Sequence, residues 1–253
     1  MHYGRTRIVL CDDYEDLGER AADQVAAKVR EVLSTQDELR VVFAAGESQS
    51  TFCRSMARRR DIEWDRITCF NMDDFWDTRL PKQFTCGNQT ERELYEKITC
   101  KKYHLVDYKA PDPEAEATRF EALLREAPLD ILCQGIGTSG HLALNEPGQT
   151  TFADDRWVRV VDLVEQSKKQ LIDDPNFKDL GYIPDRGITM TIPALMSARH
   201  VFTMVPLALK KPILTRLLET DGPTEDLPAS ILHTAESVLF VDRDSCPDKL
   251  LPV

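Results

Sequence analysis

Short apolar runs recur along the chain, and segments with helical spacing separate them. Runs of this kind are typical of strands that are covered on both faces, as in a parallel sheet. The clearest are "RVVFAAG" (40–46), "ITCFNMDDF" (67–75), "LDILCQGIG" (129–137), "HVFTMVPL" (200–207) and "SVLFVD" (237–242). Between them, apolar residues recur every three or four positions, as in amphipathic helices. The best examples are 16–34, 114–128 and 209–219.

This alternation of strand and helix predicts an α/β fold with a mainly parallel, doubly wound, Rossmann-like sheet. The 253 residues contain no repeat and no Gly/Ser linker, so we expect a single domain over 1–253. The stretch 145–187 is the least regular and is a candidate lid. Ligands of such sheets bind at the carboxyl ends of the strands, where the chemically distinctive motifs of this chain begin.

Composition indicates which partners, location and metal sites are expected for this protein. The chain has 32 basic and 43 acidic residues, a net charge of −11, which argues against nucleic-acid and anionic-membrane partners. The start "MHYGRTRIVL" lacks the apolar core of a signal peptide, and no run is long enough to span a membrane. Seven scattered cysteines form no C-x-x-C and no zinc spacing, which is typical of reduced thiols. We therefore expect a cytoplasmic protein without a metal site.

The segment "GIGTSGHLALNEPG" (135–148) matches the G-x-G-x-x-G dinucleotide fingerprint in its first six residues. That fingerprint needs a helix opening at the loop and an acid about 20 residues later, for which Asp154 or Asp155 would serve. Pro147 and Gly148 interrupt the expected helix, so the dinucleotide interpretation is disfavoured. A tight turn explains the glycines, but it does not explain the polar residues that follow.

Two acidic motifs carry candidate acid/base chemistry. His141 and Glu146 are close in sequence, and a carboxylate next to an imidazole fixes its tautomer and makes it a usable acid/base. Asp73 and Asp74 follow directly on an apolar strand, where adjacent carboxylates are costly unless they are solvated, liganded or used. Proton abstraction from carbon is one such use.

Two further motifs favour an anion. "AAGESQST" places a glycine and several hydroxyls between a strand and a helix, which suits a phosphate cradle of backbone N–H groups. It lacks the G-K-[ST] ending of a Walker A loop, and simple helix capping is the alternative. Lys210 and Lys211 follow the strand 200–207 and are in a position to reach a phosphate.

Together these motifs suit aldose–ketose chemistry on a sugar phosphate, and the chain resembles the glucosamine-6-phosphate deaminase (isomerase) family. "FNMDDF" is similar to the family's F-N-M-D-E-[YF], and "GIGTSGHLALNEPG" to its G-[IV]-G-x-[DN]-G-H-[IL]-[AG]-F-N-E-P. The resemblance implies a three-layer α/β/α sandwich and no cofactor. It also implies conversion of a 2-amino-2-deoxyhexose 6-phosphate to a ketohexose 6-phosphate and ammonia.

The resemblance also implies site residues. His141 would open the sugar ring, Asp73 would move the C2 proton to C1, and Glu146 would orient His141. The resemblance implies glucosamine 6-phosphate as substrate, and Ser139, which stands where the family usually has Asp or Asn, adds galactosamine 6-phosphate as a second candidate. The implied substrate- and phosphate-binding residues are Gly46, Glu47, Ser48, Asp74, Gly137, Gly140, Lys169 and Lys210. Lys168 is the alternative to Lys169.

Two other functions stay open. A 6-phosphogluconolactonase shares the fold and the G-H loop but typically follows the His with L-F-P and carries D-E-R where this chain has "MDDF". A sugar-phosphate-binding protein without turnover is the other alternative, and Ser139 motivates it. A homo-oligomer is compatible with the resemblance and is not determined by the sequence.

Overall fold

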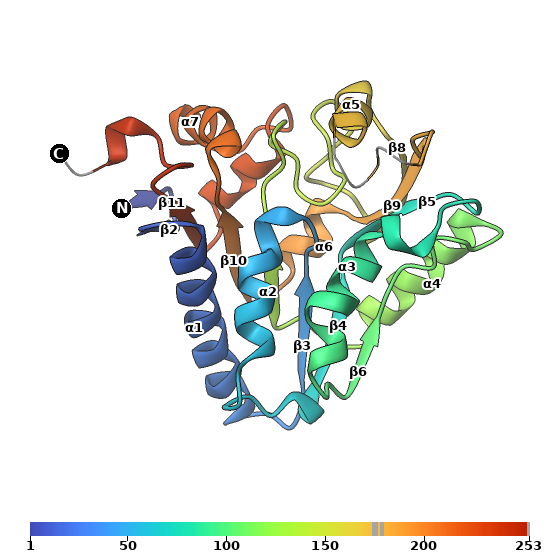
Figure 1. Ribbon diagram of the computed structural model, residues 1–253, viewed down its shortest axis with the longest axis horizontal. Coiled ribbons are helices and arrows are strands. Elements are labelled where there is room, and N and C mark those ends of the chain that lie inside the picture. Colours follow the sequence, from blue (N-terminus) through green and yellow to red (C-terminus); the bar gives the residue numbers. More distant parts are fainter. Residues whose placement is uncertain (174–176, 178–179, 252–253) are drawn as a thin grey trace.

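Strands rich in Val, Ile, Leu and Phe form the central sheet. The computed structural model describes residues 1–173, 177 and 180–251. Over those residues, eight strands pair in the order β1-β2-β11-β10-β7-β3-β4-β6, and only β1 runs antiparallel to its neighbour (Figure 1). The strands are β1 (His2–Tyr3), β2 (Thr6–Cys11), β3 (Leu39–Phe43), β4 (Ile67–Asn71), β6 (Lys102–His104), β7 (Ile131–Gln134), β10 (His200–Val205) and β11 (Ser237–Asp242).

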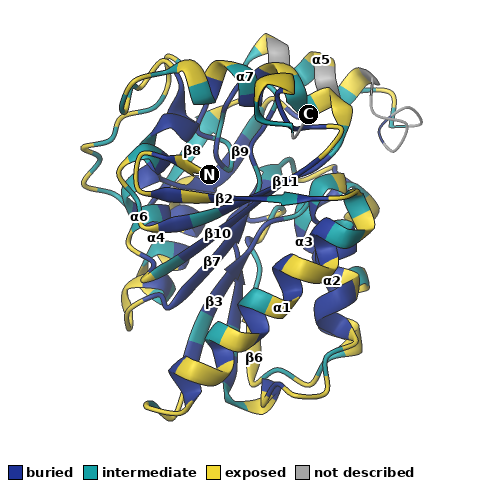
Figure 2. Cartoon of the chain, turned by 90° about the vertical axis from the view of Figure 1, so that its left-hand side faces the viewer, coloured by how far each residue is buried: buried dark blue, intermediate teal, exposed yellow. Residues whose placement is uncertain are grey.

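Alternate residues of each central strand enter two separate cores. Val41 and Phe43 of β3 pack on one side with α1 (Tyr14–Leu33) and α2 (Ser50–Ala57). Val42 of the same strand packs on the other side, in the core that includes residues of α4 (Pro113–Arg125), α6 (Ile192–Met196) and α7 (Lys211–Glu219). Figure 2 shows the sheet as a buried layer with exposed residues on the outer faces of the helices. The predicted three-layer α/β/α sandwich with a mainly parallel sheet is confirmed.

Helix α1 illustrates why these segments are helical. Asp13 caps its N-terminus by accepting a hydrogen bond from the N–H of Asp16 (2.8 Å). Acidic residues in the first turn interact favourably with the positive end of the helix dipole. The predicted apolar stripe, from Leu17 through Val25 to Val32, is buried. Our sequence prediction missed β2, whose run "TRIVLC" alternates burial less clearly, and it missed the short edge strand β6.

A second, smaller sheet was not predicted. β5 (Asp73–Trp76), β9 (Arg186–Met190) and β8 (Val158–Asp162) pair antiparallel in the order β5-β9-β8. The segment 145–187, expected to be irregular, therefore contains β8, the start of β9 and helix α5 (Glu165–Asp173). Other helical elements near the site are α3 (Cys86–Glu93) and the 3-10 turns η1 (Glu47–Gln49) and η5 (Ala208–Lys210). Residues 174–176 and 178–179 of the candidate lid lie outside the described residues.

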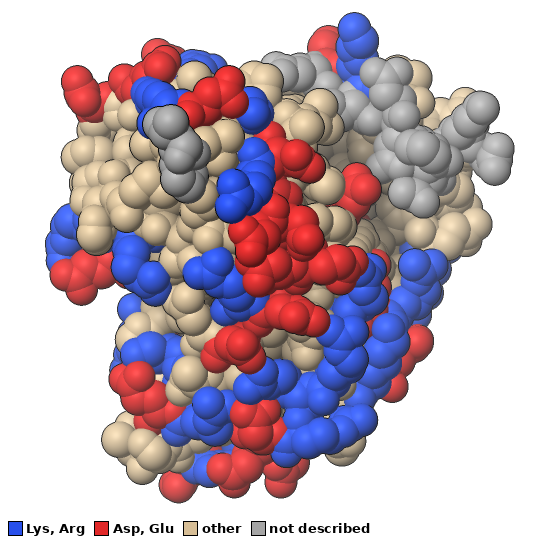
Figure 3. All heavy atoms as spheres, turned by 60° about the vertical axis from the view of Figure 1, so that its left-hand side comes forward, with Lys and Arg blue, Asp and Glu red and all other residues tan. Residues whose placement is uncertain are grey.

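Charge is unevenly distributed over the surface. Acidic side chains gather in a band on the face seen in Figure 3, and Lys and Arg gather below it. Ion pairs join α1 to α2 and to the residue that follows it: Arg54 contacts Glu15 at 2.8 Å and Arg58 contacts Glu19 at 3.7 Å. These side chains are exposed, so each pair contributes little to stability.

Candidate active site

The predicted motifs meet at one edge of the sheet. The loops that carry them follow β3, β4, β7 and β10, which are neighbours in the order β10-β7-β3-β4. Because parallel strands end at the same edge, the loops converge there, at the upper edge of the sheet in Figure 1. Asp73 is the first residue of β5 in the second sheet, and Met72 alone separates it from the end of β4. The site is therefore built where the two sheets meet.

Ser139, His141 and Glu146 form one hydrogen-bonded cluster in the loop after β7. Nδ1 of His141 lies 2.6 Å from Oε1 of Glu146 and 2.8 Å from Oγ of Ser139. The Ser139 hydroxyl donates to Oε2 of Glu146 at 2.6 Å. Ser139 and Glu146 are buried, and the His141 side chain remains 19% exposed.

These contacts determine the tautomer of His141. The Ser139 proton is used on Glu146, and the carboxylate of Glu146 accepts only, so both neighbours of Nδ1 are acceptors. Nδ1 therefore carries the proton, and Nε2 is left to exchange a proton with a ligand. Burial alone would raise the pKa of Glu146. Hydrogen bonding and charge from His141, with hydrogen bonds from Ser139 and Ser167, instead hold that pKa at about 2.

Gly137 and Gly140 are needed for steric reasons. A Cβ on Gly137 would lie 2.0 Å from both Nε2 and Cε1 of His141, so the imidazole occupies the space of a missing side chain. Gly140 has φ +90°, a conformation that favours glycine, and a Cβ there would lie 2.2 Å from Leu227. Their hydrogen bonds close the turn: Gly140 N–H donates to the Gly137 carbonyl at 2.9 Å.

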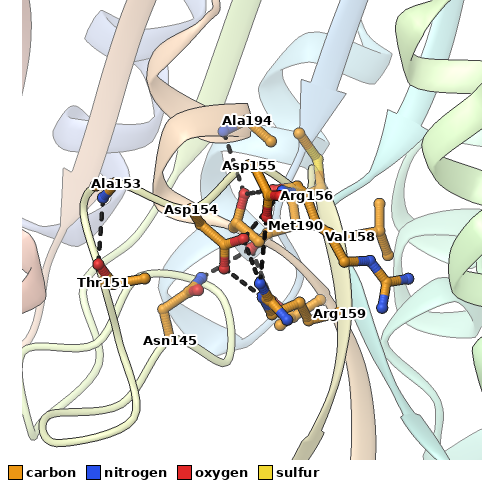
Figure 4. A network of polar contacts seen from close by, with 12 residues as sticks. Asn145, Thr151, Ala153, Asp154, Asp155, Arg156, Val158, Arg159, Met190 and Ala194 are labelled. Atoms are coloured by element: carbon orange, nitrogen blue, oxygen red, sulfur yellow. Dashed lines mark hydrogen bonds and ion pairs between the residues drawn. The ribbon is translucent and has the colours of Figure 1, made fainter.

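The dinucleotide interpretation of this loop is excluded by its surroundings. No helix opens at the glycines: the residues after Gly140 form turns and an isolated bridge between Leu142 and Asn145. Asp154, one of the two candidate ribose acids, accepts hydrogen bonds from Nη2 of Arg159 at 2.6 Å and from the N–H of Arg156 at 3.0 Å (Figure 4). This network fixes the chain after the loop onto β8.

Asp73 is a buried carboxylate at the start of β5. Within the part of the chain that the structure describes, no hydrogen bond reaches its side chain, and it is 9% exposed. Burial raises its pKa to about 6, and the charge of His141 partly opposes this shift. A carboxylate with few partners and a pKa close to neutrality is suited to take and return a proton.

Asp74 is committed to the backbone. Its carboxylate accepts the N–H groups of Phe75 (2.8 Å), Cys86 (3.0 Å) and Gly87 (2.9 Å), and the last two begin α3. Burial raises its pKa to about 7, although these N–H groups favour the charged form. Asp74 therefore holds β5 to the N-terminus of α3. Its predicted contact with the substrate stays a prediction. Its position indicates that Asp74 supports Asp73 by fixing the start of β5.

The loop Gly46–Ser48 has an open surface. Gly46 has φ +99°, and a Cβ there would meet nothing within 4 Å. Its N–H donates to Oε1 of Gln89 at 3.0 Å, which ties the loop to α3. Glu47 and Ser48 then open η1, where the first N–H groups have no partner within the helix. This geometry fits an anion cradle at the N–H groups of Glu47 and Ser48, whereas the N–H of Gly46 is already used on Gln89.

Lys210 approaches the same edge from the loop after β10. Its Nζ donates to the carbonyl of Ile136 at 2.8 Å, and burial lowers its pKa to about 8, against the opposing charge of Glu47. The preceding turn is strained: Leu207 has φ +80°, unusual for a side chain with a Cβ, and its N–H donates to Asp242 at 2.9 Å. Lys211, the alternative cation, instead pairs with Asp248 at 2.9 Å.

The cation expected in the lid region is less defined. Lys169 is exposed on α5, and its phosphate contact stays a prediction. Lys168 is paired with Asp185 at 2.7 Å. Sequence reasoning missed Ser167, whose hydroxyl donates to Oε1 of Glu146 at 2.5 Å. A serine among polar residues in "EQSKKQ" gave no signal of this contact.

The described residues contain no group of three or more His, Cys, Asp or Glu arranged to hold a metal ion. None of their helices has the length and apolar character needed to cross a membrane.

Comparison with known proteins identifies the family. The family model described as glucosamine-6-phosphate isomerases/6-phosphogluconolactonase matches residues 12–241, nearly the whole chain. The chain belongs to this family. A curated glucosamine-6-phosphate deaminase of Staphylococcus epidermidis is 32% identical over 201 residues, 78% of this chain and 80% of the relative. One from a Geobacillus strain is 25% identical over 246 residues, 94% of each protein.

Solved structures of the family share the fold. A monomeric glucosamine-6-phosphate deaminase superposes with a TM-score of 0.84 at 25% identity, covering 95% of this chain and 98% of that one. A 6-phosphogluconolactonase from Thermotoga maritima gives 0.74 at 22% identity, covering 94% and 100%. The second likeness concerns the fold alone. The expected family and fold are thereby confirmed.

Proposed function

We propose that this protein is an amino-sugar-phosphate deaminase. It would convert glucosamine 6-phosphate or galactosamine 6-phosphate to the ketohexose 6-phosphate and ammonia. The observation that carries the proposal is the buried carboxylate of Asp73, which receives no hydrogen bond from the described residues and senses the charge of His141. The names of the similar deaminases support the same reaction.

His141 and Asp73 would each carry out a different proton transfer of this reaction. With Nδ1 held by Glu146, Nε2 of His141 can move the proton needed to open the pyranose ring. Asp73 then removes the proton at C2 of the open chain, where the neighbouring C1 group acidifies it, and returns it at C1. The enolamine becomes a ketimine, and water hydrolyses it to the ketone and ammonia. The Gly46–Ser48 loop and Lys210 would hold the phosphate and so fix C1 and C2 near Asp73.

The cluster of Ser139, His141 and Glu146 is the proposed proton relay. Because Ser139 stands where the family usually has Asp or Asn, Glu146 is the one carboxylate of this relay. Its hydroxyl nevertheless bonds Glu146 and lies within hydrogen-bond distance of His141, so the relay is connected without a second negative charge. We propose that this suffices for ring opening.

Ammonia release from glucosamine 6-phosphate and galactosamine 6-phosphate, assayed in parallel, tests the proposal. Release from either sugar that disappears in His141→Ala supports it and identifies the C4 configuration. Hydrolysis of 6-phosphogluconolactone with no ammonia would instead favour the lactonase, which needs no base at C2. Calorimetric binding of a sugar phosphate with neither reaction would favour a binding protein.

Lys210 should bind the phosphate as a cation. Lys210→Met is expected to raise KM about tenfold or more, because a charge-assisted hydrogen bond is lost. In the wild type, kcat/KM should fall as the pH rises above about 8, where Lys210 loses its proton. Lys210→Arg stays charged at that pH and should lack this alkaline limb. An unchanged limb in Lys210→Arg would contradict the assignment.

Two broader expectations belong to this proposal. We infer a cytoplasmic location because all seven cysteines are free, as is usual where thiols are kept reduced. Fractionation of cells would test this. Homo-oligomer formation stays a prediction, and sedimentation of the purified protein measures it directly.

A further inference from the structure

Helix α5 contacts the Ser139–His141–Glu146 cluster through Ser167. The hydroxyl of Ser167 donates to Oε1 of Glu146 at 2.5 Å. Ser139 donates to the other oxygen, Oε2, at 2.6 Å. Two hydroxyls from different parts of the chain therefore hold the two oxygens of one buried carboxylate.

The oxygen that Ser167 contacts is also the oxygen that orients His141. Oε1 of Glu146 lies 2.6 Å from Nδ1 of His141. The terminal torsion of a glutamate is broad and only weakly restricted by its own rotamer. A donor on each oxygen removes that freedom, so the carboxylate plane, and with it the direction in which Nε2 of His141 points, is fixed.

Phe177 and Lys168 each contact elements near the second sheet. Phe177 is buried and packs against Phe75 of β5 and Phe84, with ring centroids 5.6 Å and 5.3 Å away. Lys168 of α5 contacts Asp185, which directly precedes β9, at 2.7 Å. The Lys168 contact links the residue next to Ser167 to the start of β9, in the sheet that carries Asp73.

We propose that Ser167 is a positioning residue, which fixes the Glu146 carboxylate so that His141 is aligned for proton transfer. It acts through Glu146. The inference rests on the proposed function for its kinetic consequence, and on the contact geometry alone for its effect on His141. The two parts can fail separately.

Three variants test the kinetic part, with ammonia release as the assay. Ser167→Ala is expected to lower kcat about tenfold or more with little change in KM, because a hydrogen bond to a charged group is lost. Ser167→Thr keeps the hydroxyl and should restore most of the rate. Ile172→Ala removes a 62% exposed side chain from the same helix and should leave kcat unchanged. Wild-type kcat in Ser167→Ala, or failure of Thr to rescue, would overturn the proposal.

A spectroscopic measurement tests the positioning without any substrate. The protein has five histidines, and ¹⁵N labelling with His141→Ala identifies the imidazole signals of His141. Ser167→Ala should move the Nδ1 signal, and Ile172→Ala should not. An unmoved Nδ1 signal in a folded Ser167→Ala protein would refute the role, even if the deaminase assay succeeds. If the wild type releases no ammonia but the signal moves, the proposed function fails and the positioning holds.

Discussion

Asp73→Asn should abolish most turnover and at the same time make the protein more stable. Loss of the base at C2 is expected to lower kcat about 10²–10⁴-fold, because an amide cannot accept the proton. The amide also avoids burying a charge. Burial raises the pKa of Asp73 from 3.8 to about 6, so at pH 8 the variant should gain about 2–3 kcal/mol in free energy of unfolding. Urea unfolding and ammonia release on the same samples measure both effects.

The pH dependence of that gain follows from the direction of the shift. A carboxyl whose folded pKa is raised costs stability where it must ionise, so the cost grows from pH 4 to about 6 and is then constant. Below pH 4 the wild type and Asp73→Asn should be equally stable. Asp77→Asn is the matched control, because hydrogen bonds from Arg79 lower the pKa of Asp77. It should keep its activity and lose stability at neutral pH. Full activity in Asp73→Asn would remove Asp73 from the mechanism.

Gly137→Ala is expected to disable the relay without removing a polar group. The added Cβ would lie 2.0 Å from the imidazole of His141, so the ring must move away from its place over the loop. A displacement of about 1 Å at a reacting group can cost about 100-fold in rate, and we expect a loss of kcat of that order. Steady-state kinetics with a melting curve separates this loss from unfolding.

Gly135→Ala serves as the control in the same loop. Its Cβ would meet side-chain ends, Nε2 of Gln49 at 2.9 Å and Oγ of Ser48 at 3.1 Å, and not the imidazole of His141. This variant should keep kcat within a few-fold of the wild type. Equal losses in the two variants would mean that the loop as a whole, and not the place of His141, is sensitive to added bulk.

The fold could be predicted where local pattern and burial agree. Five of the central strands are continuous apolar runs covered on both faces, and α1 has a regular stripe from Leu17 to Val32. The second sheet could not be predicted, because its pairings join distant segments. Asp73 pairs with Thr189 and Val158 with Met190, and neither partner has a local pattern that specifies the other.

The candidate site divides in the same way. His141, Glu146 and Ser139 lie within eight residues, so a motif could bring them together, and the structure places them in contact. Asp73 could be predicted as a site residue because it follows directly on an apolar strand. The roles of Asp74 and Ser167 depend on tertiary contacts, with the first turn of α3 and with Glu146, that no spacing along the chain encodes.

The pairing of β5 with β9 has a consequence for how the site comes into being. Closing a long loop is entropically unfavourable, and contacts between distant segments form late and slowly. The strand that carries Asp73 finds its partner only when residues 186–190 are available. The loop that carries His141 is completed later still, because the carbonyl of Gly140 accepts the N–H of Ala229 at 2.9 Å. During synthesis, β3, β4, β6 and β7 can pair early, whereas β2 finds its partner only in β11, and catalytic competence should arise late, after residue 229 has left the ribosome.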